Sequence, residues 1–162
     1  MSNIPTTGKK IRAINLAGNS VGKQRQGIYQ QAHEHIVIAM DSGFYLEAIT
    51  LIESLISDRL ESRLTYLLGT DFSFKVLHDL IKETQKNEAD EILLNLVTID
   101  LDEWRKQRNK AIHEMVKIVE GDTSTWEYRS NKLPAIATEG HALLRKIERR
   151  VQSLRDKAQR NK

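Results

Sequence analysis

The sequence predicts an all-α fold, a helical bundle of about five helices formed by a single domain. Three observations favour this class. The chain of 162 residues contains only two Pro. Apolar residues recur three and four positions apart along most of it, which is the period of an amphipathic helix. No run of residues alternates between apolar and polar, as a half-buried strand would.

The composition excludes several classes of protein. Because the chain has no Cys, it has no disulfide framework, thiol nucleophile or Cys-ligated metal site. No apolar run approaches the roughly 18 residues needed to cross a bilayer. The segment 6–10 is polar and lacks the apolar stretch of a secretory signal. We therefore expect a soluble, cytoplasmic protein with no membrane partner.

The two ends of the chain are basic and its middle is acidic. Residues 1–25 contain five Lys or Arg and no acid, residues 141–162 contain eight against two acids, and a total charge of +3 leaves −8 for residues 26–140. Residues 1–25 also lack periodicity, which predicts a flexible basic N-terminal arm before a single helical domain, 26–162. Basic ends can guide a polyanion to the surface, although solvated tails explain the same charges.

Breaks in the apolar period divide this domain into helices. The first is expected over about 26–41 and the second over about 44–68, with Gly69 at its end. The apolar stripe of the second helix is wider than one contact within a monomer needs, which leaves room for burial against a second chain. Its members are Leu46, Ile49, Leu51, Ile52, Leu55, Ile56, Leu60, Leu64 and Leu67.

A shorter helix is expected next, over about 72–86, with Asp71 as its N-cap. A long helical stretch follows over about 88–119. A bend near Asp100 would fit, because Asp100 and Glu103 have the spacing of a capping box. The remaining elements are a turn-rich loop over 121–131 and a last helix after Pro134.

Most familiar functional sites have no counterpart in the sequence. Gly18 and Gly22 precede no Lys-Ser or Lys-Thr pair at the spacing of a phosphate-binding loop. No Ser has the setting of a nucleophile elbow. His33 and His35 stand two apart, which on a helix points them to opposite sides and makes a poor metal pair. We therefore expect neither a metal ion nor a cofactor.

Polar and charged residues crowd one stretch that is otherwise apolar, 104–115. Within it Asn109 and His113 are four apart, so they share a helix face, about 40° from coincidence, and the amide can orient the imidazole. Arg108 precedes His113 by five residues, which turns it about 140° away. Two copies related by a two-fold axis can still bring both side chains to one cleft, and we expect such a homodimer.

These residue types suit the cleavage of RNA. Imidazole titrates near neutral pH and can move a proton to or from the 2′-hydroxyl or the leaving 5′-oxygen. A guanidinium binds phosphate oxygens and stabilises the charge that builds in the transition state. Because the 2′-hydroxyl is an internal nucleophile, the reaction requires neither a metal ion nor a covalent enzyme intermediate.

The same residues resemble a known family. Arg108-Asn109-Lys110-Ala111-Ile112-His113 matches the R-x4-6-H signature, in its RN-xxx-H form, of the HEPN superfamily (higher eukaryotes and prokaryotes nucleotide-binding domains). The segment 43–53 is similar to the long helix that precedes the motif helix in that family, so the likeness covers about residues 43–119.

The resemblance implies a HEPN-like helical bundle that dimerises with its two motifs facing each other. It also implies a metal-independent endoribonuclease of a toxin–antitoxin or phage-defence (abortive infection) system. Arg108 and His113 would be its catalytic residues, with Asn109 orienting the ring or touching the phosphate. An antitoxin or another partner would restrain the nuclease.

A second interpretation stays open. HEPN-like folds include noncatalytic scaffolds and regulators, among them the mannitol operon repressor family, whose motif segment is similar. The chain would then be a helical dimer that acts as a regulator or protein-interaction module. The presence of Arg, Asn and His together in the motif favours the nuclease.

Several other polar residues are candidates for supporting roles. Glu53 lies in an apolar stretch of the second helix and is expected to hold Arg108 or His113 in place, unless it is simply exposed. Basic residues of the motif helix are candidates for contacts with the RNA backbone, which supply affinity rather than sequence choice. These candidates are Arg105, Lys106 and Lys110.

Three further residues each have two possible roles. Arg59 and Arg63 are four apart and suit phosphate binding, but Glu61 between them equally indicates a mixed solvated face. Trp104 is expected to anchor the core rather than to stack on a base.

Overall fold

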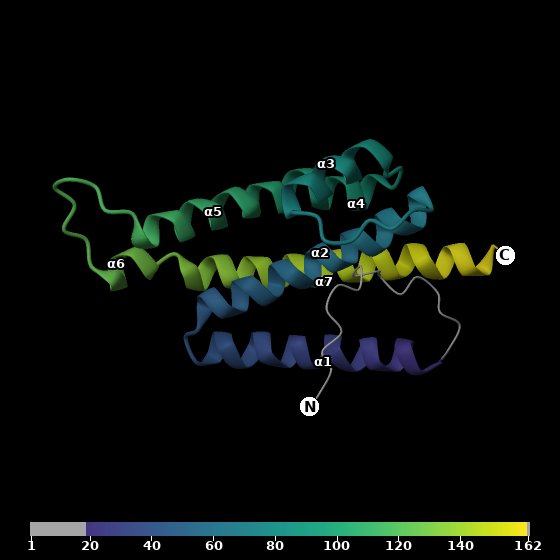
Figure 1. Cartoon of the computed structure of the whole chain (residues 1–162), viewed down its shortest axis with the longest axis horizontal. Helices are drawn as coiled ribbons and strands as arrows, with labels where there is room; N and C mark the ends of the chain where they lie inside the picture. Colours follow the sequence, from purple (N-terminus) through teal and green to yellow (C-terminus); the bar gives the residue numbers. More distant parts are fainter. Residues whose placement is uncertain (1–18, 162) are drawn as a thin grey trace, which may run out of the picture.

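The computed structural model describes residues 19–161, with side chains from residue 24 onward. Within this range all regular structure is helical and no strand is present, which confirms the predicted all-α class (Figure 1). The elements in chain order are α1 (Asn19–Asp41), α2 (Tyr45–Leu68), α3 (Leu77–Asn87), α4 (Glu91–Asn95), the π-helical segment η1 (Leu96–Leu101), α5 (Asp102–Val116), α6 (Trp126–Ser130) and α7 (Leu133–Arg160).

The helices form three layers (Figure 1). α1 lies on one side, α2 and α7 form the middle layer, and α3, α4 and α5 lie on the other side. α2 crosses α7 and also packs against α1 and α3, so it is surrounded by neighbours of its own chain. This central position accounts for the broad apolar stripe of α2, most of which is buried within one chain. The stripe therefore gives no argument for a second chain, contrary to the expectation from sequence.

α1 begins earlier than expected. It starts at Asn19, about seven residues before the start expected near residue 26. Arg25 ties this part of α1 to its neighbours: its guanidinium hydrogen-bonds the hydroxyl of Tyr29 one turn later (3.0 Å) and forms an ion pair with Asp58 of α2 (3.0 Å). The rest of the predicted arm, residues 1–18, lies outside the described residues.

α3 begins later than expected. Its N-cap is Val76 and not Asp71, whose carboxylate instead accepts a hydrogen bond from the hydroxyl of Ser73. Phe74 adopts a φ of 59°, a left-handed conformation that cannot continue a right-handed helix. The backbone N–H of Lys75 also donates to the buried carboxylate of Glu61 on α2 (3.1 Å), which ties the segment before α3 to the middle layer.

α4, η1 and α5 follow one another without a break from Glu91 to Val116. No helix starts at Asp100, so the expected capping box with Glu103 is absent: Asp100 lies inside η1, where the backbone remains helical and needs no cap. π-helical turns are frequent at functional sites.

Trp104 is the anchor of α5, as the sequence predicts. Its side chain is fully buried, and its indole N–H donates to the carbonyl of Ile136 on α7 (2.9 Å). The ring lies directly on Gly140, where a Cβ atom would come within 2.6 Å of the indole. The absence of a side chain at Gly140 therefore lets α5 approach α7 closely.

The connection between α5 and α7 is more ordered than a simple loop. α5 ends at Val116 rather than near 119, and residues 126–130 of the predicted loop form the short helix α6. Thr125 caps α6, its hydroxyl accepting from the N–H of Tyr128 (3.3 Å). α7 then begins at Leu133 with Pro134 in its first turn, where the missing N–H costs no hydrogen bond.

Candidate functional site

Arg108 points from α5 toward α2. Its guanidinium forms an ion pair with Glu53 and lies 6.0 Å from the centre of the Trp104 ring. The side chain is 16% exposed, and its Nε is buried without a hydrogen-bond partner. Because the carboxylate and the indole hold one end of the guanidinium, Arg108 is oriented before any substrate binds.

Glu53 therefore makes one of the two contacts expected of it from sequence. It lies on the side of α2 that faces α5, and its side chain is partly exposed beside that of Arg108. No contact joins Glu53 to His113 among the described residues.

His113 and Asn109 lie on the outer side of α5. His113 is exposed and Asn109 is half-buried. Neither side chain makes a hydrogen bond or an ion pair within the described part of the chain, so the expected bond from the amide to the imidazole is not formed. The spacing of four places the two residues on one face but does not bring their polar atoms within hydrogen-bond distance. Both remain available to a ligand.

The basic residues around the motif fall into two groups. Arg105 and Lys106 both bind the carboxylate of Asp102, each at 2.8 Å, and the hydrogen bond from Lys106, followed by that from Arg105, holds the pKa of Asp102 below its usual range. Arg105 is mostly buried in this pairing, whereas Lys106 extends into solvent. Lys110 is also exposed, with Glu114 at 4.0 Å. Lys106 and Lys110 therefore fit the predicted contact with a backbone phosphate better than Arg105.

Arg129 organises the segment after α5, a role that sequence reasoning missed. Its Nη1 donates to the carbonyls of Glu114 (2.7 Å) and Lys117 (2.5 Å), while Nη2 pairs with Asp122 (2.9 Å). One guanidinium thus satisfies carbonyls left open at the C-terminal end of α5. A lone Arg in a turn-rich loop gives no sequence signal for this capping.

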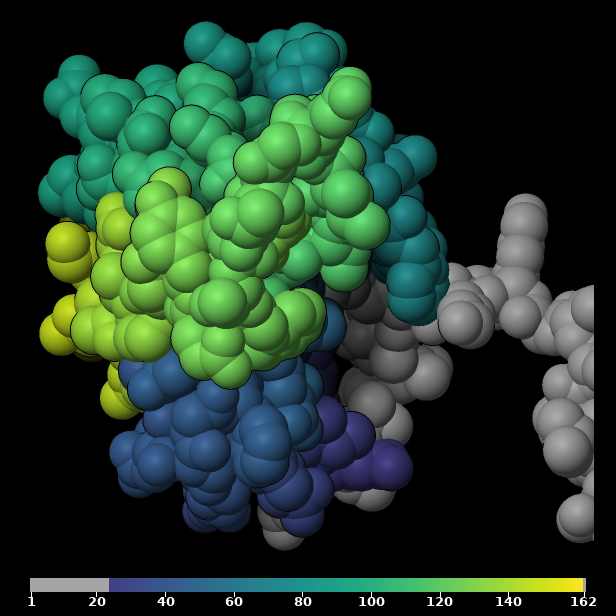
Figure 2. Space-filling model, turned by 90° about the vertical axis from the view of Figure 1, so that its left-hand side faces the viewer, coloured from purple at the N-terminus to yellow at the C-terminus, as the bar shows by residue number. Residues whose placement is uncertain are grey.

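This end of the molecule presents apolar side chains to solvent. Figure 2 looks at it directly, with the segment from α5 to α6 lying across the middle of the face. Ile118 is 89% exposed and Tyr128 is 68% exposed. We call these exposed residues the apolar tip; its members are Val116, Ile118, Val119, Trp126 and Tyr128. The tip adjoins the last turn of α5, which contains His113.

A second group of charged residues lies away from the motif, around α2. Arg59 binds Glu148 of α7 (3.2 Å), and Arg63 binds the buried Glu88 at the end of α3 (2.7 Å). Both Arg side chains are mostly buried, so the expected mixed solvated face is wrong. His33 also contacts Glu148 (3.0 Å), because helices distant in sequence meet here.

No group of three or more His, Asp or Glu within the described residues is arranged to hold a metal ion. None of the described helices has the length and apolar character to span a membrane. Comparison with protein-family models, with curated proteins and with solved structures gives no match to this chain.

Proposed function

We propose that the chain is a metal-independent endoribonuclease that cleaves RNA by attack of the 2′-hydroxyl. The observation that supports this proposal is the arrangement on α5: Arg108 is held by Glu53, while His113 is exposed and the half-buried Asn109 has no hydrogen-bond partner among the described residues. The products would be a 2′,3′-cyclic phosphate and a 5′-hydroxyl. Its biological setting would be a toxin–antitoxin or phage-defence system, with a partner that restrains it.

Each motif residue has a distinct role in this reaction. His113 takes the proton of the 2′-hydroxyl or donates a proton to the leaving 5′-oxygen, as the bond from the 2′-oxygen to phosphorus forms and the bond to the 5′-oxygen breaks. Arg108 donates hydrogen bonds to the non-bridging phosphate oxygens, whose charge grows in the transition state. Asn109 contacts the same phosphate from the face of His113.

A dimer completes the site in this proposal. Arg108 and His113 point about 140° apart on one helix, so a single chain does not direct both at one phosphate. A second copy would supply the missing side chain and also a second imidazole, so that base and acid are present together. The exposed apolar tip beside His113 supports this arrangement, because a partner would remove it from water.

Cleavage of a labelled RNA oligonucleotide tests the proposal. We expect activity in excess EDTA and none on a substrate with a single 2′-deoxy substitution at the scissile nucleotide. His113→Ala should lose about 10²–10⁴-fold in rate, since that is the usual contribution of general acid–base catalysis. Arg108→Ala should also lose a large share of the rate. His35→Ala is the matched control, because His35 is an exposed histidine on α1, away from the motif.

The noncatalytic interpretation has a specific observation in its favour. Arg108 is already neutralised by Glu53, and the apolar tip is a surface suited to a protein partner. In this alternative the motif shapes a dimer that acts as a regulator or interaction module. Pure protein that cuts no RNA but binds one protein or DNA partner specifically would support it. Equal cleavage by His113→Ala and the parent would show that the motif is not an active site.

A further inference from the structure

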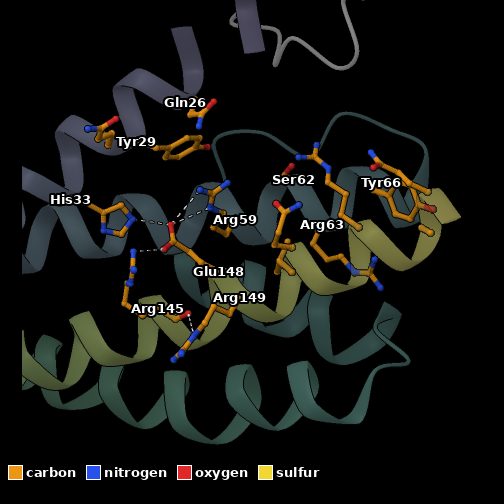
Figure 3. A pocket seen from close by; sticks show the side chains of 16 residues that line it. Gln26, Tyr29, His33, Arg59, Ser62, Arg63, Tyr66, Arg145, Glu148 and Arg149 are labelled. Atoms are coloured by element: carbon orange, nitrogen blue, oxygen red, sulfur yellow. Dashed lines mark hydrogen bonds and ion pairs between the residues drawn. The ribbon is translucent and has the colours of Figure 1, made fainter. Parts of the chain in front are cut away.

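A pocket of about 550 Å³ lies between α1, α2 and α7 (Figure 3). No residue of α5 lines it, and it lies on the opposite side of the middle layer from the motif (Figure 1). Its volume is within the usual range for small-molecule sites, about 300–1,000 Å³. The pocket is therefore a separate candidate site with its own ligand.

Arginines dominate the described lining of this pocket. Five of them contribute, against one acid, Glu148. Figure 3 shows His33, Arg59 and Arg145 converging on that carboxylate from three helices. Arg149 bends back to donate to the carbonyl of Arg145 (3.1 Å), so it contributes mainly its stem. Positive charge in the lining exceeds what Glu148 neutralises.

The arginines of α2 are fixed in place with donors to spare. Arg59 uses Nε and Nη2 on Glu148, and its guanidinium lies 4.0 Å from the ring centre of Tyr29, a close cation–π contact. Arg63 likewise uses Nε and Nη2 on Glu88. Because a guanidinium has five N–H donors, each side chain keeps three for a ligand. Because these ion pairs already fix the two guanidiniums in place, they lose little conformational freedom when they bind an anion.

The arginines of α7 are less committed. Arg145 is 60% exposed and reaches Glu148 only at 3.9 Å. Arg155 is exposed and makes no ion pair within the described part of the chain. It lies seven residues after Glu148, about 20° from it around the helix, so both face the same groove. The two residues stand ten positions apart on α7, about 15 Å along its axis, so they reach different parts of the groove.

We propose that this pocket binds a small ligand with adjacent phosphate groups, of the size of a nucleoside di- or triphosphate. Guanidiniums from two neighbouring helices, α2 and α7, suit a chain of phosphates, since each can form charge-assisted hydrogen bonds with phosphate oxygens. The remaining lining supplies neutral polar groups for the rest of the ligand, among them the amides of Gln26 and Gln159 and the half-exposed ring of Tyr66. The site does not depend on the nuclease proposal.

Isothermal titration calorimetry of the full chain tests this site with two probes, inorganic tripolyphosphate and ATP, in EDTA at low salt. We expect saturable binding with one ligand per chain. Arg145→Gln/Arg155→Gln should weaken it by about tenfold or more, because each change removes a charged hydrogen-bond donor. Both residues are exposed, so the fold should persist. The matched control is Lys146→Gln/Lys157→Gln, which removes the same charge from exposed positions of α7 outside the pocket.

Three outcomes would overturn the proposal. The first is that the parent protein binds neither probe saturably. The second is that both double variants weaken binding equally, which would indicate general attraction to a basic helix. The third is that neither probe binds, while a single-stranded RNA oligonucleotide binds and Arg145→Gln/Arg155→Gln weakens that binding. This result would assign the groove to an RNA strand. The nuclease proposal is tested by the separate cleavage assay, and these binding results do not affect it.

Discussion

At the scale of single residues, the pair formed by Glu53 and Arg108 has the clearest consequence for function. Glu53→Gln keeps a hydrogen-bond acceptor but removes the charge that orients Arg108. We expect RNA cleavage to slow by about tenfold or more, because a charged hydrogen bond contributes roughly 1.5–3 kcal/mol. Rate measurements should show the loss mainly in kcat, with substrate binding less affected, because the change acts through Arg108.

Glu47→Gln is the control for this variant. Glu47 is an exposed acid on the same helix, and its change should leave cleavage unaltered. If Glu53→Gln melts at a much lower temperature yet cleaves at the parent rate, the ion pair stabilises the fold and does not position Arg108 for catalysis.

The close approach of Trp104 to Gly140 gives a prediction about stability. In Gly140→Ala the new Cβ would lie 2.6 Å from the indole, so the ring or α7 has to move. We expect a loss of about 1–3 kcal/mol in the free energy of unfolding, the usual cost of overpacking a core. Urea denaturation followed by circular dichroism measures it.

Gly27→Ala is the matched experiment in α1. Nothing lies within 4 Å of a Cβ at Gly27, so alanine should stabilise that helix by about 0.5–1 kcal/mol. The two substitutions are expected to change stability in opposite directions. If both stabilise the protein, the packing of Trp104 on Gly140 is looser than described.

Residue types predicted contacts well where burial alone decides them. The burial of Trp104 and the contact of Glu53 with Arg108 could both be predicted from sequence, because a large aromatic residue and an acid in an apolar stretch each need a specific environment. Gly140 and Arg129 were not. Their roles depend on which helix or loop segment packs against them, and local sequence does not contain that information.

At the scale of elements, Asp90 links the start of α4 to α7. Its carboxylate caps α4 by accepting from the N–H of Leu93 (2.9 Å) and also binds Arg150 through Nε (2.8 Å). The hydrogen bond from Arg150 is the main reason that the pKa of Asp90 falls from 3.8 to about 2. A depressed pKa means that the folded state favours the charged carboxylate.

Stability should therefore decline in acid through this group. The contribution is fully present above pH 3.8, the ordinary pKa, and is lost as the pH falls toward about 2, the pKa in the folded protein. It amounts to about 2 kcal/mol. Asp90→Asn keeps a good capping residue but has no charge. Unfolding free energies of the parent and this variant should differ above pH 3.8 and converge near pH 2; a constant difference across this range would contradict the linkage.

Helical period predicted the long elements better than their ends. α2 was expected over nearly its true range because its apolar repeat is unbroken, and Gly69 adopts the left-handed conformation that ends a helix. The start of α3 was misplaced because a positive φ at Phe74 has no signature in sequence. The π-helical η1 was equally hidden, since its apolar residues have spacings that an α-helix also allows.

At the scale of the whole molecule, the two candidate sites lie apart, and this affects how they can be tested. The motif and the apolar tip belong to one end of the bundle, and the basic pocket lies between α1, α2 and α7 (Figures 1 and 3). The all-α architecture was predictable from periodicity and the motif residues from their spacing, but neither the apolar tip nor the basic pocket was predictable. A surface forms where elements distant in sequence meet, as Arg59 and Glu148 do. Variants in one site should leave the other's readout unchanged.

The last prediction concerns assembly. If a second copy covers the apolar tip, sedimentation at micromolar concentration should report about twice 18.6 kDa. Ile118→Glu should shift the protein to monomer and abolish most cleavage, because it places a charge in the interface. Its side chain is 89% exposed in the single chain, so the monomer fold should be unaffected.

Ile92→Glu provides the comparison, since Ile92 is an exposed apolar residue of α4, which lies toward the other end of the bundle (Figure 1). It should remain dimeric and active. A dimeric Ile118→Glu protein would place the interface elsewhere on the bundle. A strictly monomeric protein that still cuts RNA would contradict the shared site itself, because one α5 directs Arg108 and His113 about 140° apart. Cleavage would then require both groups to act from a single chain, through a rearrangement of the Arg108 ion pair with Glu53.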